Sequence, residues 1–222
     1  MPLRYDPEAA ARSLAAADPT LGLLIERVGP CRISLTRSGP PFTALVESIA
    51  YQQIAGHAAA RILERVVALY RPRRFPRPED LLATPDERLR EAGLSRNKIA
   101  AMKDLAAKCL DGTVPPSRTL HRLDEAAIVE RLTAVRGVGP WTVEMLLIFN
   151  LGRPDVLPAT DYGVRQGFRA TYRTRGLPAP SRILKHGERW RPFRSVAAWY
   201  LWRAVDLAKK GGDAAGDEGG TA

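Results

Sequence analysis

The chain of 222 residues has few side chains of the kinds that bind metals or cross-link a fold. Its two cysteines, Cys31 and Cys109, lie far apart and form no CxxC pair, which excludes a four-cysteine iron–sulfur cluster and a cysteine-rich zinc site. We expect both to be reduced packing residues. The three histidines are scattered without an HExxH pattern. A catalytic metal held by side chains is therefore not expected.

Long apolar runs are absent as well. No segment approaches the roughly 20 apolar residues that a membrane-spanning helix needs. The first residues, MPLRYDPEAAARSL, lack the basic and then apolar layout of a secretory signal. No pattern indicates an oligomer interface. We therefore expect a soluble, cytoplasmic monomer without a membrane partner.

Positive charge is abundant. Lysine and arginine number 34 against 24 acidic residues, which gives a formal net charge of +10. The segment after Lys210 carries acidic residues and no basic one, so the excess lies in the rest of the chain. A basic surface suits a polyanion such as nucleic acid. The alternative is a GC-rich genome that favours arginine codons.

Helical patterns fill most of the sequence. Asp6 and Pro7 suit the cap and first position of a helix to about residue 17, and Pro19 starts a second one to about residue 28. Further helices are predicted from Pro41, over 57–70, and from about Phe193 to Lys210. No stretch shows the strict alternation of several strands, so the chain is predicted to be all-α.

A glycine turn between two helical patterns is the most informative feature. It is Gly137-Val138-Gly139, within LTAVRGVGPWTVEMLL. Glycine tolerates positive φ and has no Cβ to obstruct an approaching phosphate. Pro140 fits the first turn of the next helix, whose free N–H groups favour an anion. Such a turn can hold a nucleic-acid backbone without reading its sequence. The alternative is an ordinary glycine-containing turn.

Features on both sides of the turn favour the nucleic-acid interpretation. Leu132, Val135 and Val138 can pack inside the turn, and Arg136 adds positive charge. Asp161 is the only acidic residue in LPATDYGV. By itself it is a good helix N-cap. A carboxylate fixed at a helix start can also stabilise developing positive charge, and the two roles are compatible.

The segment LTAVRGVGPWTVEMLL followed by DVLPATDYGVRQGF resembles the helix-hairpin-helix base-excision DNA glycosylases, and most closely the 3-methyladenine DNA glycosylase II branch. The similarity continues at FTALVESIAYQQIAGHAAARI (42–62) and GERWRPFRSVAAWYLWRA (187–204), and covers most of the chain from about 40 to 205. The long bacterial form has an extra N-terminal α/β domain, for which this chain leaves no room.

The resemblance implies a domain organisation. We expect one helical subdomain over 41–145, which includes the hairpin, and a C-terminal helical subdomain over 146–210, with an active-site cleft between them. The N-terminal helices, 1–40, are expected to pack with the C-terminal subdomain. The glycine-rich segment 211–222 is expected to be a disordered tail.

The implied activity is excision of alkylated purines, of the 3-methyladenine and 7-methylguanine type, from duplex DNA in base excision repair. The enzyme would flip the base out and hydrolyse its N-glycosidic bond, with Asp161 as the catalytic residue. Branches that also cut the strand carry a lysine after the Gly-Pro pair, for Schiff-base chemistry. Here that residue is Trp141, which implies no lyase step. Such a protein would be associated with the nucleoid.

The resemblance also assigns a base pocket, because electron-rich rings attract the cationic ring of an N-alkylated purine. Its predicted residues are Trp141, Trp202, Tyr162, Met145, Tyr51 and Gln52. Met145 stands where the closest enzymes have an aromatic residue, so the pocket is expected to be more open. The alternative is that these aromatics are core residues, as is expected of Trp190 and Trp199.

Contacts to the DNA itself are assigned to a wedge and to the hairpin. Gln53 would fill the space that a flipped base leaves; the alternative is a polar residue on an exposed helix face. The predicted hairpin contacts are Arg136, Gly137, Val138, Gly139 and Thr142. The family's hairpin often holds a monovalent cation through backbone carbonyls, here those of Thr133, Val135 and Val138. No other cofactor is expected.

Three other functions remain open at this point. The chain could be a non-catalytic helix-hairpin-helix module that recruits a repair partner, a glycosylase for oxidised or mismatched bases, or a basic structural protein without lesion preference. Asp161 and the aromatic residues argue against the first. The missing cluster cysteines and the missing lysine argue against the commonest forms of the second.

Overall fold

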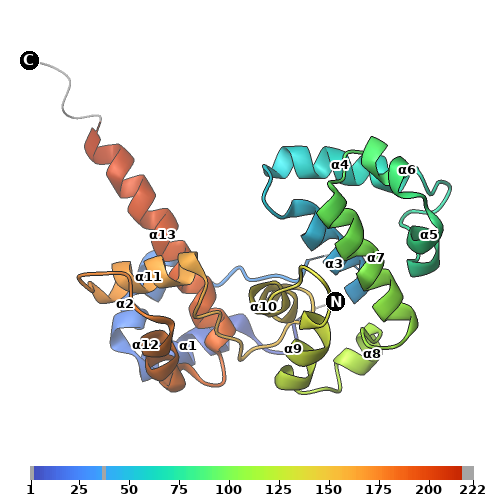
Figure 1. The fold of residues 1–222 in the computed structure, drawn as a ribbon. Coiled ribbons are helices and arrows are strands. Elements are labelled where there is room, and N and C mark those ends of the chain that lie inside the picture. Colours follow the sequence, from blue (N-terminus) through green and yellow to red (C-terminus); the bar gives the residue numbers. More distant parts are fainter. Residues whose placement is uncertain (1–2, 37–38, 217–222) are drawn as a thin grey trace, which may run out of the picture. The chain divides into compact units, whose positions relative to one another are not determined.

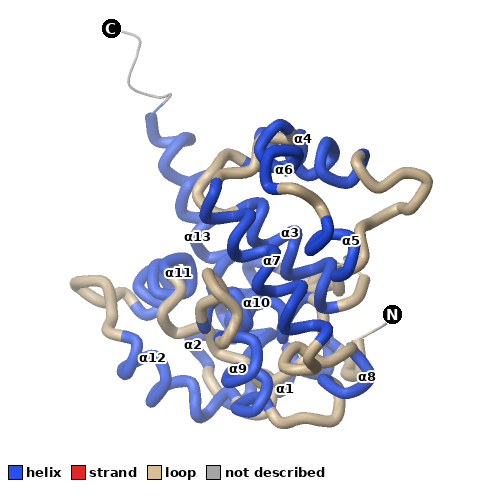
Figure 2. Tube along the Cα trace, turned by 45° about the vertical axis from the view of Figure 1, so that its right-hand side comes forward, coloured by secondary structure: helices blue, strands red, loops and turns tan. Residues whose placement is uncertain are grey.

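A computed structural model describes residues 3–36 and 39–216 of the chain. Within these ranges every regular element is a helix, and the helices are joined by loops and turns without any strand (Figure 2). The predicted all-α class is therefore confirmed.

The chain forms two compact units. Unit 1 combines Met1–Leu35 with Gly152–Ala222, and unit 2 is Thr36–Leu151. The boundary expected at residue 145 instead falls inside helix α10 (Pro140–Phe149). The reason is local: α10 runs without interruption from the hairpin, and Gly152, with φ of 66°, is the first position where the backbone leaves helical geometry for a conformation that favours glycine.

Unit 1 is built from both ends of the chain (Figure 1). Helices α1 and α2 pack against α13, and α2 also packs against α11. The predicted starts of the first two helices are confirmed, because Asp6 and Asp18 cap them through their side chains. The elements of this unit are α1 (Pro7–Ala17), α2 (Pro19–Val28), α11 (Tyr162–Tyr172), α12 (Pro180–His186), the 3-10 turn η1 (Gly187–Trp190) and α13 (Arg194–Gly216).

Helix α13 is assigned through Gly216, and the disordered tail expected over 211–222 stays a prediction. Residues 217–222 of the predicted tail lie outside the described residues.

A buried aspartate organises the core of unit 1. The side chain of Asp18 is almost inaccessible to solvent, and its carboxylate accepts hydrogen bonds from Tyr172 Oη at 2.7 Å and Trp190 Nε1 at 3.0 Å. His186 Nε2 lies 2.9 Å from the same oxygen. Burial alone would raise the pKa of Asp18, but the hydrogen bonds from these three side chains and from Leu21 N–H outweigh it and lower that pKa.

We expect the Asp18→Asn variant to be less stable by about 1.5–3 kcal/mol at neutral pH, because an amide cannot accept all these bonds. The folded-state pKa of Asp18 is depressed, so its contribution is complete above the ordinary carboxyl pKa of about 3.9 and is lost as pH falls below it. Urea denaturation between pH 7 and 3 should therefore show a smaller acid-induced loss in the variant. Equal losses in both proteins would contradict this.

Unit 2 is a separate helical cluster. Helix α7 packs against α3, α5 and α6, and α10 packs against α3 and α9. Its buried core includes Leu45, Ile49, Met102 and Leu105. The predicted helix over 57–70 is α4. The elements are α3 (Pro41–Tyr51), α4 (Gly56–Ala68), α5 (Pro78–Ala83), α6 (Asp86–Glu91), α7 (Arg96–Leu110), α8 (Ser117–Leu120), α9 (Glu125–Thr133) and α10 (Pro140–Phe149).

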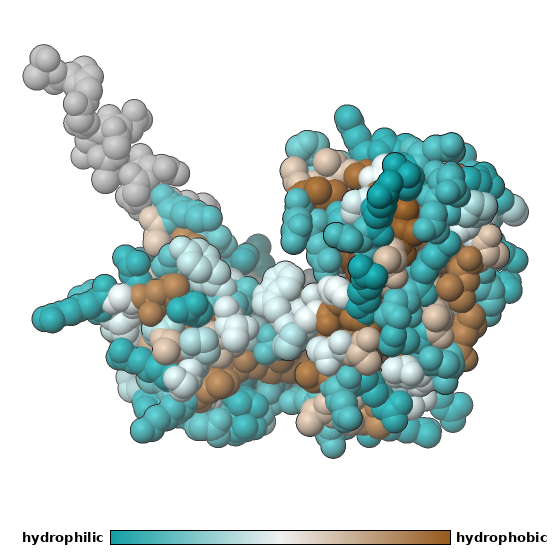
Figure 3. Space-filling view, in the orientation of Figure 1, coloured by the Kyte–Doolittle hydropathy of each residue, from teal (hydrophilic) through white to brown (hydrophobic). Residues whose placement is uncertain are grey.

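The surface of both units is dominated by hydrophilic side chains on the face that Figure 3 shows, with smaller hydrophobic patches among them. In the described part of the chain, none of the helices is both long and apolar enough to cross a membrane.

Candidate functional site

Asp161 lies at the start of α11, where an extended segment turns into the helix. Its backbone has φ −61° and ψ 129°, and its Oδ1 accepts the Val164 N–H at 2.7 Å as a helix cap. The same oxygen accepts the Nε1–H of Trp202 at 2.7 Å. The side chain is partly buried. A capping bond and an indole bond therefore hold the carboxylate in one orientation at the edge of unit 1.

Two glycines of α11 make this contact possible. A Cβ at Gly167 would lie 1.9 Å from the carbonyl oxygen of Leu201, so the backbones of α11 and α13 touch at that point. One turn earlier, a Cβ at Gly163 would lie 2.8 Å from Trp202 Cδ1 and 3.1 Å from Asp161 Oδ1. Neither glycine is among the predicted site residues. Their four-residue spacing in GVRQG is the signal of close helix packing that could have identified them.

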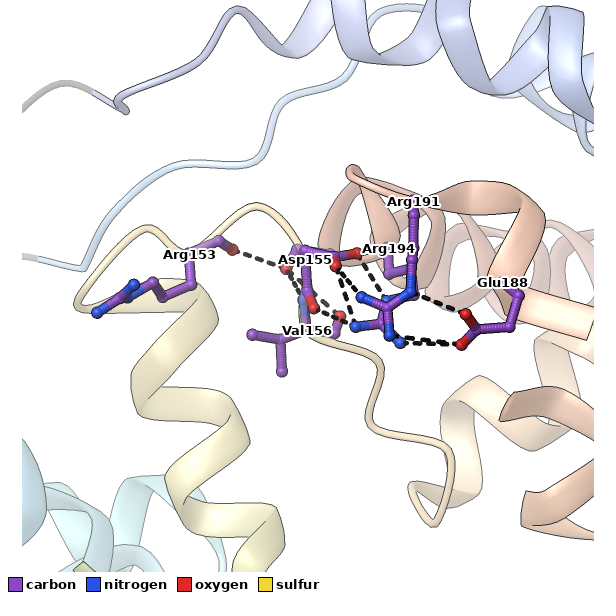
Figure 4. A network of polar contacts seen from close by, with 7 residues as sticks. Arg153, Asp155, Val156, Glu188, Arg191 and Arg194 are labelled. Atoms are coloured by element: carbon purple, nitrogen blue, oxygen red, sulfur yellow. Dashed lines mark hydrogen bonds and ion pairs between the residues drawn. The ribbon is translucent and has the colours of Figure 1, made fainter. Parts of the chain in front are cut away.

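A polar network fixes the two segments that carry Asp161 and Trp202 (Figure 4). Arg194, in the first turn of α13, donates to Asp155 through Nε at 2.6 Å, and Arg191 donates to the other oxygen of Asp155 at 2.6 Å. Ser195 Oγ is buried and accepts the Val156 N–H at 3.0 Å. The start of α13 is thus attached to the segment that leads to the aspartate.

Tyr162 follows Asp161 and points to solvent. Its side chain is 65% exposed, and its hydroxyl accepts from Gln166 Nε2 at 2.6 Å, one helical turn further along α11. Trp202 is partly buried, and Trp190 is fully buried. The core assignment of Trp190 is therefore confirmed, and Trp199 is a partly buried residue packed against the same core. Tyr162 and Trp202 flank Asp161 within unit 1.

The glycine hairpin connects α9 to α10 in unit 2. Gly137 has φ 75°, in the region that favours glycine, and Gly139 is the N-cap of α10. The Val138 N–H closes the turn on the Val135 carbonyl at 3.0 Å. Leu132, Val135 and Val138 are buried, as the sequence predicts. Arg136 is exposed beside them.

Two side chains from outside the hairpin hold its backbone. Asp104 on α7 accepts the Arg136 N–H at 2.7 Å, and Gln52 donates its Nε2–H to the Gly137 carbonyl at 2.9 Å. Burial acts to raise the pKa of Asp104, but the bonds from the Arg136 N–H and from Lys108 outweigh it and lower that pKa. The N–H groups of Gly137 and Gly139 meet no acceptor within 3–36 and 39–216. They are the hairpin donors suited to a phosphate.

Asp104 has no local sequence signal, because it lies 32 positions before its partner Arg136. We expect Asp104→Ala to weaken DNA binding about fivefold to tenfold. The lost hydrogen bond to a charged acceptor is worth about 1.5–3 kcal/mol, and only part of this free energy contributes to DNA binding. Asp104→Asn keeps an acceptor and removes a negative charge, so its affinity should be equal to wild type or higher. Fluorescence anisotropy with a labelled duplex would measure both. Weaker binding by the asparagine variant would refute the anchoring role.

The turn after α3 is fastened to the hairpin by Gln52. Lys98 Nζ also donates to the Ala50 carbonyl at the end of α3, at 2.7 Å. Between these two anchors Gln53 is exposed and has φ 57°, a backbone conformation that costs a non-glycine residue energy. Tyr51 is exposed too. The structure thus uses the Gln52 amide as a link within unit 2 and presents Gln53 at the surface.

Residues of α10 divide between surface and core. Trp141, in the first turn, is 47% exposed. Thr142 is only 6% exposed, because helical periodicity turns its side chain inward. Its predicted contact to DNA would therefore use the backbone N–H near the helix start. Met145 and Thr142 line a cavity of about 190 Å³ together with Ala44, Ser48 and Phe149.

The three hairpin carbonyls predicted to bind a cation differ in how many of their lone pairs are free. The Val135 carbonyl already accepts the Val138 N–H, which leaves its second lone pair. No donor from the described residues reaches the carbonyls of Thr133 and Val138. In the same residues no group of three or more His, Cys, Asp or Glu side chains could hold a metal ion.

Comparison with known proteins identifies the family to which this chain belongs. Residues 46–192 match the model of the HhH-GPD superfamily base excision DNA repair proteins. The chain belongs to this family, and the match includes the hairpin and Asp161.

Three relatives show how far the similarity extends. DNA-3-methyladenine glycosylase 1 of Schizosaccharomyces pombe is 37% identical over 88% of this chain and 86% of its own length. A solved structure of the S. pombe 3-methyladenine DNA glycosylase (Mag1) in complex with abasic DNA is 37% identical, with a TM-score of 0.78 over 88% of this chain and 95% of that one. A DNA-3-methyladenine glycosidase from Bacillus halodurans is 33% identical, with a TM-score of 0.83 over 90% and 91%.

Proposed function

We propose that this protein is a monofunctional DNA glycosylase that hydrolyses the N-glycosidic bond of N-alkylated purines in duplex DNA. The observation that carries the proposal is the carboxylate of Asp161, capped by Val164 N–H and bonded by Trp202 Nε1–H. The chain that carries this carboxylate belongs to a family of base-excision DNA repair proteins. Relatives named as 3-methyladenine glycosylases support the choice of alkylated bases.

The chemistry requires one fixed anion. When the bond between C1′ and the base breaks, its electron pair leaves with the base, and positive charge develops on the sugar. The Asp161 carboxylate stabilises that charge, and its two hydrogen bonds keep it from reorienting during the reaction. A water molecule then adds to C1′ and loses its proton to the carboxylate. The products are a free base and an abasic site.

The exposed aromatic residues suit an alkylated substrate. N-alkylated purines are cationic, and the faces of Trp141 and Tyr162 are accessible to solvent. Alkylation also weakens the bond to the sugar, so a modest catalyst suffices. We assign Trp141, Tyr162, Trp202 and Met145 to base binding, and Gln53 to the space left by the flipped base.

The experiment that tests the function is base release from DNA treated with a methylating agent, with the released bases resolved by chromatography. Release of methylated purines is the expected result. No release, with equal affinity for damaged and undamaged DNA, would favour a basic structural protein without lesion preference. Release of an oxidised or mismatched base instead would move the protein to another lesion class.

The absence of a lyase step is a part of the proposal that can be tested separately. The residue after Pro140 is Trp141, which has no amine for a Schiff base. Product strands should therefore remain intact on a gel until heat or alkali is added, and borohydride should trap no covalent complex. Spontaneous nicking would show that another amine acts as the nucleophile.

We also propose that a monovalent cation binds the carbonyls of Thr133, Val135 and Val138 and would bridge the hairpin to a phosphate. Affinity for abasic-site DNA should then be several-fold higher in potassium or sodium than in tetramethylammonium at equal ionic strength. Titrations by anisotropy in the three chloride salts would measure this. Equal affinities would mean that the hairpin binds through its N–H groups alone.

A further inference from the structure

A groove between α11 and α13 in unit 1 is lined mostly by residues without an assigned role. Tyr162 and Gly163 are the exceptions. The groove has a volume of about 840 Å³ and begins at Tyr162 and Gly163, directly beside Asp161. Ala170, Val205 and Ala208 contribute small apolar side chains to it. Arg169, Arg173 and Lys209 contribute three cations, and no acidic residue lines it.

Arg169, Arg173 and Lys209 differ from several other basic residues of unit 1 in having no acidic partner among the described residues. Arg191 and Arg194 pair with Asp155, and Arg203 pairs with Asp206. Arg169, Arg173 and Lys209 are exposed, and in the described part of the chain none has an ion-pair partner. Unneutralised charge along one groove creates a positive potential that attracts a polyanion.

The backbone of Arg173 is a second, independent observation. It ends α11 in the left-handed conformation, with φ 50° and ψ 41°. Glycine is the usual residue at such a helix end, because a side chain there costs free energy. Strained positions of this kind gather at ligand-binding sites. An arginine in this place exchanges some stability for a cation at the mouth of the groove.

We propose that this groove binds the phosphodiester backbone of duplex DNA and extends the protein's DNA contact along α11, away from Asp161. The proposal rests on the proposed function, because it takes DNA as the substrate. The groove is continuous with the candidate site through Tyr162 and Gly163.

The dimensions suit a strand rather than a single ion. The α-helical rise of 1.5 Å per residue makes the stretch from Tyr162 to Arg173 about 16 Å long, which equals the axial length of roughly five base pairs of a duplex. Arg169, in the last turn of α11, and Arg173, directly after the helix, both line this groove. Gln166 adds an amide on the way.

The test is the salt dependence of binding to an undamaged duplex, measured by anisotropy with the full chain. The triple variant Arg169→Gln, Arg173→Gln and Lys209→Gln should reduce the slope of log K against log salt by about 2 to 3, and weaken binding at 0.1 M salt at least about tenfold. The control variant Arg12→Gln, Arg182→Gln and Lys185→Gln loses the same charge at exposed positions of α1 and α12. Its slope should change by less than about 1.

A single substitution separates binding from stability. Arg173→Gly suits the left-handed conformation, so its melting temperature should be equal to wild type or higher, whereas its DNA affinity should fall several-fold. If Arg173 serves only the fold, the variant will bind DNA as the wild type does, and the proposal is wrong.

The outcomes are independent of whether the protein is a glycosylase. Equal slopes for the two triple variants would overturn the groove as a DNA site, even if base release is found. Loss of affinity for polyglutamate without a change in the DNA slope would also overturn it and indicate an acidic protein partner. Conversely, a smaller slope without base release would support the groove and refute the proposed chemistry.

Discussion

Replacing Asp161 by asparagine is expected to reduce the rate of base release by about a hundredfold to a thousandfold, which is the usual loss when a group that stabilises transition-state charge is removed. Asparagine keeps an oxygen that can accept from the Val164 N–H and from Trp202 Nε1–H, and it is itself a good N-cap. Only the negative charge is removed. Single-turnover release from methylated DNA measures the effect, and affinity for abasic-site DNA should change by less than about threefold.

Asp124 provides a matched control for this substitution. It caps α9 through the same kind of bond, its Oδ1 accepting the Ala127 N–H at 2.7 Å. Asp124→Asn makes the same chemical change at a helix start of unit 2, and it should leave the rate as in the wild type. A large loss in both variants would mean that capping matters and charge does not. Full activity of Asp161→Asn would end the catalytic assignment.

Much of the fold could be predicted because local rules act on neighbouring residues. The Asp6-Pro7 pair fixed the first helix start, and the glycine turn fixed the hairpin, since cap and turn preferences depend on a few adjacent positions.

The site was only partly predictable for a related reason. The hairpin stands out in the sequence through its glycines and proline, whereas Asp161 by itself is only a helix cap and is assigned through the family resemblance. Asp104 and Asp155 do not stand out, because each acts on a residue more than thirty positions away through a hydrogen bond that leaves no local pattern. The inward direction of the Thr142 side chain was not predicted either, since it depends on how helix α10 packs.

The close approach of Trp202 to Asp161 leads to the second large effect, at Gly163. A Cβ at this position would lie 2.8 Å from Trp202 Cδ1 and 3.0 Å from its Nε1, closer than side-chain carbons come. Gly163→Ala should therefore push the indole away from the carboxylate and loosen its orientation. A displacement of about 1 Å at a catalytic group can cost about a hundredfold in rate. We expect that loss in single-turnover release, with DNA affinity nearly unchanged.

A double-mutant cycle distinguishes this positioning role from general damage. Trp202→Phe removes the N–H donor, so adding Gly163→Ala to it should lower the rate little further, because both changes break the same contact. Gly56→Ala, with nothing within 4 Å of its added Cβ, should be neutral. Gly167→Ala meets the Leu201 backbone and should instead lower the melting temperature. Additive losses in the cycle would show that Gly163 acts on something other than the bond between Trp202 and Asp161.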